Sequence, residues 1–269
     1  MKTYLYKMEC LTNMHVGSGD ESYNLVDREV QKDVVLQDVP CIHASGIKGA
    51  LREYFVENGA DEEFILKTFG GEKVTSTKSD IGKKQIIVRE TQPGSWRFFG
   101  AKLIARPLRV SSGSRPYLLS TSNDILSDFS NALQAIGLEN LYEYKKFNVP
   151  ENTFVSTTDV SELEGFPVRK IDDNPLSMLI GEDYAVSQTM RDFDLPIIAR
   201  NTLDDDGKSQ NLWYEEVVPH KSIFYFAIMT PDDDIADLDG KIVQFGGSAS
   251  IGQGFTLLTQ VSPEKGGDK

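Results

Sequence analysis

The sequence contains few cysteines, few histidines and no long run of apolar residues. Two cysteines, Cys10 and Cys41, and three histidines are too few for a disulfide framework, and none of them has zinc-site spacing, so we expect both cysteines to be buried thiols. The apolar run at residues 223–229 is far shorter than the ~20 residues that cross a bilayer. The N-terminal segment alternates like a strand and lacks the apolar core of a signal peptide. These absences predict a cytoplasmic, globular protein with no membrane partner.

Positive charge is also scarce. The chain has 28 Lys and Arg against 41 Asp and Glu, and its net charge of −13 argues against a free-standing, non-specific nucleic-acid binder. Residues 78–115 are the exception, because they hold nine Lys or Arg and only two acids. An acidic body with one basic stripe suits a subunit that holds RNA along a single groove. A solvated basic face is the alternative interpretation.

Two glycine-containing segments, residues 11–19 and 43–52, have the composition of phosphate-binding loops. In the second, small residues precede Lys48, which opens an apolar run, so we expect a loop with free amides to lead into a helix N-terminus that binds anions. The spacing lacks the Ser or Thr after lysine that a magnesium-bound triphosphate needs. A capped helix with an exposed lysine is the alternative. The predicted RNA contacts here are Gly17, Ser18, Gly19, Ser45, Gly46, Lys48, Gly49 and Arg52.

Asp27 is the candidate catalytic acid, because it is a carboxylate within a long polar loop at residues 12–38. One carboxylate can help a ribose 2′-OH attack the adjacent phosphorus, or can recruit a divalent ion, most simply Mg²⁺, for the same step. The alternative is an aspartate held by Arg28 or Lys32 in an inert loop. His15 is a candidate proton donor, or else a residue that fixes the loop by hydrogen bonding.

Two later segments complete the set of candidate sites. Residues 197–218 predict a β-hairpin with an Asp206-Gly207 turn, on which we expect Trp213 to belong to the core. Residues 246–254 are rich in glycine, which leaves amides free to surround an anion. The RNA contacts predicted in these two segments are Arg200, Lys208, Gly246, Gly247, Gly252, Gln253 and Gly254.

Periodicity and turn residues predict an α+β fold. We expect helices at residues 45–58, 60–69 and 124–136, and an irregular insertion at about 72–84. The predicted strands are residues 3–11, 39–43, 85–90, 96–103, 117–121, 223–229 and 255–260. This pattern fits a ferredoxin-like (RRM-like) core, although the aromatic residues with which RNA-recognition motifs stack bases are missing, so binding through backbone loops is favoured.

Taken in order, the segments at residues 11–19, 43–52, 198–219 and 245–254 resemble the RAMP-type backbone subunit of the type III-B CRISPR (Cmr) effector complex. The resemblance implies one domain over residues 1–269, with a palm core, a long catalytic loop, an insertion at 72–84 and a thumb hairpin at 197–218 that wedges between bases. It also implies that Asp27 is required for target-RNA cleavage. The family usually has an arginine where this chain has Gln253. Residues 212–216 favour type III-B over type III-A.

The resemblance therefore predicts a metal-dependent endoribonuclease that is active in the assembled complex. Its expected partners are guide RNA, complementary target RNA, further copies of itself stacked head to tail, and other type III effector subunits. The first alternative is a catalytically inactive scaffold that only binds guide RNA. The second is a small-molecule enzyme that holds a phosphorylated metabolite with Lys48 and residues 246–254.

Overall fold

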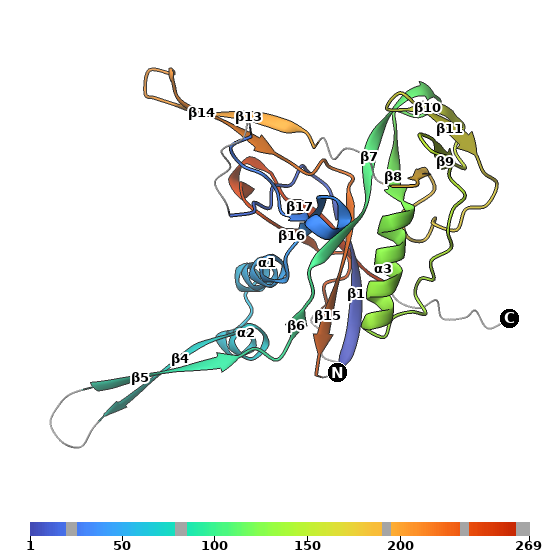
Figure 1. Ribbon diagram of the computed structural model, residues 1–269. Helices are drawn as coiled ribbons and strands as arrows, with labels where there is room; N and C mark the ends of the chain where they lie inside the picture. Colours follow the sequence, from blue (N-terminus) through green and yellow to red (C-terminus); the bar gives the residue numbers. More distant parts are fainter. Residues whose placement is uncertain (20–25, 79–84, 190–194, 232–236, 262–269) are drawn as a thin grey trace.

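A computed structural model describes residues 1–19, 26–78, 85–189, 195–231 and 237–261, with only the backbone of residues 73–78 and 85–89 (Figure 1). The fold is α+β, as the sequence predicts, and is dominated by one long mixed sheet in the order β10-β11-β9-β12-β8-β7-β15-β1-β17-β16. None of the helices in these ranges is long and apolar enough to cross a membrane.

The bounds of the elements are as follows. The helices are α1 (Ala44–Glu57), α2 (Glu62–Phe69) and α3 (Asn123–Ala135), with 3-10 turns η1 (Val34–Leu36) and η2 (Ala249–Ile251). The strands are β1 (Lys2–Cys10), β2 (Lys32–Asp33), β3 (Val39–Ile42), β4 (Gly70–Lys78), β5 (Gln85–Pro93), β6 (Arg97–Phe98), β7 (Ala101–Gly113), β8 (Tyr117–Ser122), β9 (Phe154–Ser156), β10 (Val160–Leu163), β11 (Phe166–Lys170), β12 (Tyr184–Ser187), β13 (Ile197–Leu203), β14 (Ser209–Glu216), β15 (Ile223–Thr230), β16 (Ile242–Gln244) and β17 (Phe255–Val261).

The predicted apolar strand near residue 223 is β15, which lies between β1 and β7 and is buried along nearly its whole length. Successive side chains of a strand point to opposite faces, so β15 supplies both sides of the core. On one side Tyr225 packs against Phe129 of α3, with ring centroids 5.0 Å apart. Its neighbour Phe226 stacks on Tyr6 of β1 at 5.5 Å and meets Phe245 at 6.3 Å. Residues far apart in sequence thus pack against β15, and this strand holds together the elements that surround it.

The two cysteines behave largely as predicted. Cys10 is buried in β1 and Cys41 is half-buried in β3. Burial raises the pKa of both thiols above the ordinary value, so both stay protonated near neutral pH.

The helices match the predictions closely at their ends. Ser122 caps α3, because its hydroxyl accepts a hydrogen bond from the Ile125 amide at 3.3 Å. The start of α1 is confirmed to within one residue of the predicted residue 45. The helix begins at Ala44, so Ser45 and Gly46 lie in its first turn. Their backbone is therefore already helical, although the helix N-terminus itself stays where an anion was expected.

Two hairpins project from the body as separate two-stranded sheets, β4–β5 and β13–β14 (Figure 1). The first is a correction, because residues 72–78 are strand and not an irregular insertion; residues 79–84 lie outside the described ranges. The β-branched residues Val74, Thr75 and Thr77 favour the strand. At its base, a Cβ added to Gly70 would come within 2.6 Å of the Gln92 carbonyl oxygen, so glycine permits the close approach of the two strands.

Candidate functional site

The segment that carries Asp27 is attached along the outer edge of β14. The amides of Asp27 and Arg28 donate to the Tyr214 carbonyl at 3.0 and 3.2 Å, and the Glu216 amide donates to the Arg28 carbonyl at 2.9 Å. The Tyr214 amide in turn donates to Oδ2 of Asp27 at 2.7 Å. Asp27 remains exposed. The carboxylate is therefore held by main-chain atoms of the hairpin while it faces solvent.

The alternative of an inert Asp27 paired with Arg28 or Lys32 does not match these contacts. Arg28 lies 3.7 Å from Glu215, and Lys32 lies 3.1 Å from Glu216 and 3.8 Å from Glu29. Both cations thus have carboxylate partners other than Asp27. The charge of Asp27 is left available to a ligand.

Asp27 and His15 lie in the walls of one hollow of about 500 Å³. The hollow opens between the first glycine segment, the Asp27 segment and β14. Three predicted RNA contacts, Gly17, Ser18 and Gly19, line it together with Arg28, Glu29, Asn211, Leu212 and Trp213. The structure thus brings the two candidate catalytic residues and one candidate phosphate loop to the same place.

The protonation of His15 follows from its neighbours. Its Nδ1 lies 2.7 Å from the Glu216 carbonyl oxygen, which can only accept, so Nδ1 carries a hydrogen and donates. In the neutral ring Nε2 is then the acceptor. It lies 3.8 Å from a carboxylate oxygen of Glu215. His15 is therefore oriented so that Nε2 is the atom able to exchange a proton.

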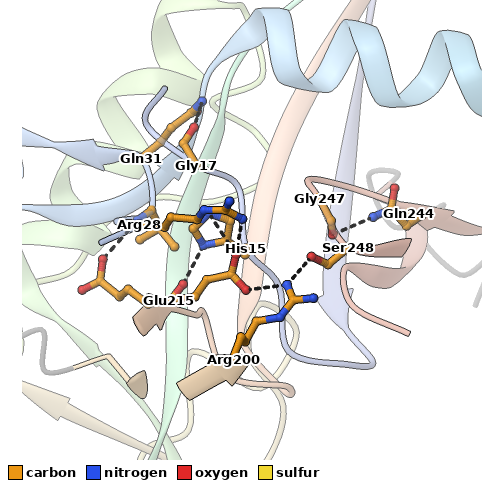
Figure 2. A network of polar contacts seen from close by, with 11 residues as sticks. His15, Gly17, Arg28, Gln31, Arg200, Glu215, Gln244, Gly247 and Ser248 are labelled. Atoms are coloured by element: carbon orange, nitrogen blue, oxygen red, sulfur yellow. Dashed lines mark hydrogen bonds and ion pairs between the residues drawn. The ribbon is translucent and has the colours of Figure 1, made fainter. Parts of the chain in front are cut away.

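Glu215 is the centre of a buried polar network that the sequence did not reveal (Figure 2). Its side chain is only 1% exposed, and Arg200 reaches it at 2.9 Å. Arg200 also donates to the Ser248 hydroxyl at 2.7 Å, which ties the hairpin to the glycine-rich loop. Figure 2 shows His15, Arg28 and Arg200 arranged around the carboxylate of Glu215. The network joins the base of the hairpin to both loops of the site.

Trp213 lies within this network and not in the core, which corrects the prediction. Its half-buried ring has the Arg28 guanidinium 5.2 Å from its centroid and the Arg200 guanidinium at 5.3 Å. Both distances are within the range of cation–π attraction. Arg200, predicted as an RNA contact, thus has its charge engaged inside the protein by Glu215 and Trp213.

Gln31 links three segments that are separate in sequence. Its side-chain amide donates to the Gly17 carbonyl at 3.1 Å, and its side-chain oxygen accepts from the His43 amide at 2.8 Å. His43 is the residue before α1. The first glycine segment, the Asp27 segment and the start of α1 are therefore held together.

The glycine-rich loop packs directly on the first segment. The Gly247 amide donates to the His15 carbonyl at 2.9 Å, and the Gly254 amide donates to the Asn13 carbonyl at 2.8 Å. Gln253 is only 8% exposed, so its side chain faces the protein interior in the single chain. The prediction that this loop contacts RNA therefore depends on its backbone groups.

The remaining predicted contacts lie outside the hollow. Ser45, Lys48, Gly49 and Arg52 are exposed on the first turns of α1, and Lys208 is exposed at the tip of the hairpin. Glu215 and Glu216 were missed. The only sequence signal was a pair of adjacent acids at the end of the hairpin, and alternation along β14 sends their side chains to opposite faces.

Replacing Gly246 with alanine is expected to destabilise the protein by at least about 2 kcal/mol, because a Cβ at this positive φ of 81° is strained and would come within 2.1 Å of the His15 carbonyl oxygen. Gly247→Ala is the matched control, since a Cβ there meets no atom within 4 Å. Urea denaturation of both variants measures the difference. Equal stabilities would contradict the close packing of the loop on His15.

The site offers few protein donor atoms to a divalent metal. In the described ranges, no three His, Cys, Asp or Glu side chains lie close enough together to hold a metal ion. Asp27 offers one carboxylate, whose Oδ2 already accepts a hydrogen bond. A metal here would therefore need ligands from a bound RNA, which is how Mg²⁺ often binds beside phosphates.

The sequence matches a known family over most of its length. The chain belongs to the RAMP superfamily, whose family model matches residues 7–256. It is 27% identical over 303 aligned residues to the CRISPR system Cmr endoribonuclease Cmr4 of Pyrococcus furiosus, and the match covers 96% of each chain.

Solved structures share the same fold. A chain in the cryo-EM structure of the type III-B Cmr-beta bound to cognate target RNA matches with a TM-score of 0.73 at 19% identity, over 97% of both chains. Oligomeric Cmr4 from Pyrococcus furiosus, known from a crystal structure, matches with a TM-score of 0.67 at 22% identity, over 97% of this chain and 98% of that one. Both matches extend over nearly the whole chain.

Proposed function

We propose that this protein is a backbone subunit of a type III-B CRISPR effector complex, which binds guide RNA and cleaves complementary target RNA. The observation that carries the proposal is the Asp27 carboxylate, held on the wall of the His15 hollow by the backbone of a projecting hairpin. The similarity to the Cmr endoribonuclease Cmr4 supports the reaction class. Guide RNA, target RNA, further copies of the chain and other effector subunits would be its partners, in the cytoplasm.

The reaction would need two proton transfers on either side of one phosphodiester. Asp27 would take the proton of a ribose 2′-OH, and the 2′-oxygen would attack the adjacent phosphorus. The bond from phosphorus to the 5′-oxygen would break, and this oxygen would take a proton from Nε2 of protonated His15. The products would be a 2′,3′-cyclic phosphate and a 5′-hydroxyl. Because the Tyr214 amide holds Asp27, the carboxylate would be in place before RNA arrives.

The alternative role of Asp27 would be to hold a divalent cation, most simply Mg²⁺, together with phosphate oxygens of RNA, and the ion would then neutralise charge at the phosphate that is cleaved. Lys48, Arg52 and Lys208 are exposed and would contact the RNA backbone without reading its sequence. Glycine amides at residues 17–19 would surround the phosphate beside Asp27.

The architecture fits this role as a single domain over residues 1–269. Four antiparallel strands lie side by side in the order β7-β15-β1-β17. Numbered by their order along the chain, these are the second, third, first and fourth of the four strands. This is the ferredoxin-like order, with α1 between its first two strands, and it supports a palm core. The β13–β14 hairpin would be the thumb. The β4–β5 hairpin would take the place of the predicted insertion.

The proposal is tested with the complex reconstituted on guide RNA and an end-labelled complementary target, with Mg²⁺ or with EDTA. We expect a ladder of products at regular intervals, with cyclic-phosphate ends, that EDTA removes. Binding of guide and target without any cleavage would leave a scaffold subunit. Failure to bind either RNA would contradict the proposal as a whole.

A further inference from the structure

Arg28 brings a permanent positive charge to the wall of the hollow that Asp27 and His15 share. Among the described residues that line this hollow, Arg28 alone is a lysine or arginine, and the acids are Asp27 and Glu29. A guanidinium group is always charged in proteins and carries five N–H donors in a planar fork. The side chain of Arg28 is 56% exposed, so these donors are accessible to a ligand in the hollow.

The contact of Arg28 with Glu215 is loose. Nη1 of Arg28 lies 3.7 Å from Oε1 of Glu215, which is longer than the usual N–H···O hydrogen bond of about 2.7–3.2 Å. Arg200 lies 2.9 Å from the other oxygen, Oε2, and its side chain is only 21% exposed. Glu215 therefore keeps a close partner if Arg28 turns away. An ion pair whose cation is more than half exposed is weak, so Arg28 can change partners at small cost.

The backbone of Arg28 is fixed although its side chain is loosely held. Its amide donates to the Tyr214 carbonyl at 3.2 Å, and its carbonyl accepts from the Glu216 amide at 2.9 Å. Its guanidinium lies over the Trp213 ring, 5.2 Å from the centroid. Cation–π attraction extends to about 6 Å from the centroid, so the planar group can shift across the ring without leaving it. Arg28 is thus a long side chain that turns about a fixed Cα at the edge of the hollow.

Cleavage of RNA beside Asp27 calls for a positive charge at the phosphate. A phosphodiester carries one negative charge, and attack by the 2′-oxygen increases the charge on its non-bridging oxygens. The carboxylates of Asp27 and Glu29 repel this charge. The amides of residues 17–19 are neutral dipoles and offset only part of the repulsion. Arg28 lies in the same wall and follows Asp27 directly in the chain, so its charge can offset the rest.

We propose that Arg28 is a catalytic residue that binds the non-bridging oxygens of the phosphate that is cleaved. The inference rests on the proposed function and adds a third group to its reaction. When target RNA enters the hollow, the guanidinium leaves Glu215 and donates two parallel hydrogen bonds to the phosphate, which is the geometry in which arginine commonly binds this group. Arg200 remains on Glu215.

Arg28 neither gains nor loses a proton in the reaction. Asp27 takes the proton of the 2′-OH while the 2′-oxygen bonds to phosphorus. Protonated His15 gives its Nε2 proton to the 5′-oxygen as the bond from phosphorus to that oxygen breaks. The charge on the non-bridging oxygens rises as the first bond forms and falls as the second breaks. The hydrogen bonds of Arg28 are therefore strongest in the transition state, and only such interactions accelerate a chemical step.

The first test is single-turnover cleavage of an end-labelled target by the complex reconstituted on guide RNA. We expect Arg28→Ala to cleave bound target at least about a hundredfold more slowly than wild type, because loss of one such donor typically costs about 10²–10³-fold. Arg28→Lys keeps the charge but not the fork, and its rate should lie between the two. Arg169→Ala is the matched control and should cleave at the wild-type rate, since Arg169 is exposed on β11 and does not line the hollow.

The second test separates contact with the phosphate from an effect through Glu215. Two targets carry sulfur in place of one or the other non-bridging oxygen at the cleaved linkage. Sulfur is a poor hydrogen-bond acceptor, so wild type should cleave these targets more slowly than the all-oxygen target. We expect this slowing to be at least about threefold smaller in Arg28→Ala, because the hydrogen bond that sulfur weakens is already absent. A residue that only positions Glu215 would leave the slowing unchanged, and that result would overturn the inference.

Three further outcomes decide the matter. Cleavage by Arg28→Ala within a factor of about three of wild type would overturn the inference and leave the proposed function standing. Loss of target binding by Arg28→Ala, with bound target cleaved at the wild-type rate, would make Arg28 a binding residue only and would also overturn it. If wild type itself does not cleave, the proposed function fails and the inference fails with it. Should Arg28→Ala melt well below wild type, Arg28→Lys serves in both tests.

Discussion

Replacing Asp27 with asparagine is expected to slow target-RNA cleavage by at least about a hundredfold, while guide and target binding remain unchanged. Asparagine keeps an oxygen that can accept the Tyr214 amide hydrogen bond, so the segment should stay attached to β14. What it removes is the carboxylate that would accept the 2′-OH proton, and a positioned acid or base typically contributes 10²–10⁴-fold. The measurement is single-turnover cleavage of an end-labelled target by the reconstituted complex.

Asp205→Asn is the matched control for this variant, because Asp205 is an exposed aspartate at the tip of the same hairpin, outside the hollow. Asp205→Asn makes the same chemical change as Asp27→Asn, and the complex that contains it should cleave target RNA at the wild-type rate. Cleavage by Asp27→Asn within a factor of about three of wild type would rule out proton transfer by Asp27. Equal loss in both variants would instead assign the effect to the hairpin as a whole.

Replacing Glu215 with glutamine is expected to lower the free energy of unfolding by about 3 kcal/mol. Removing one member of a buried ion pair leaves its partner's charge uncompensated, which typically costs 3–5 kcal/mol. Arg200 is the main partner, since its side chain is 21% exposed, whereas that of Arg28 is 56% exposed and is better solvated. Guanidinium denaturation of the purified protein measures the change.

The control is Glu9→Gln, which breaks a contact of Glu9 with Lys221 at 3.4 Å in which both side chains are about a third or more exposed. That change should cost less than about 1 kcal/mol. If Glu215→Gln were no more destabilising than Glu9→Gln, Arg200 would reach solvent readily, and the link between the hairpin and the glycine-rich loop would not depend on Glu215.

Local pattern located the three helices and about half of the strands, but it predicted none of β9 to β12 and took β6 and β7 as a single strand at residues 96–103. The apolar spacing at residues 124–136 predicted α3 to within one residue at each end. The run at 223–229 became β15 because both faces of that strand are buried. The β4 strand was missed, since its threonines, serine and lysines read as a polar loop although their backbone pairs with β5.

The site was predictable only in part, for a physical reason. Asp27, His15 and the glycines of residues 17–19 were proposed from the composition of their loops and from the family resemblance, and the structure places them around one hollow. Glu215 could not be found this way, because its importance comes from burial beneath Arg200 and Arg28, and burial of a charged residue leaves no local signal. Trp213 was misplaced for the same reason, as a large aromatic ring ordinarily indicates core and here its half-buried ring lies between two guanidinium groups.

The hydrogen bond that holds Asp27 comes from a main-chain amide, and every amino acid except proline supplies one. Position 214 is therefore free to change its side chain over evolutionary time without moving the acid. The tyrosine at this position is 43% exposed, and its side chain takes no part in this hydrogen bond. Homologous subunits should accept many residues at position 214, and only proline should be excluded by the chemistry of the site.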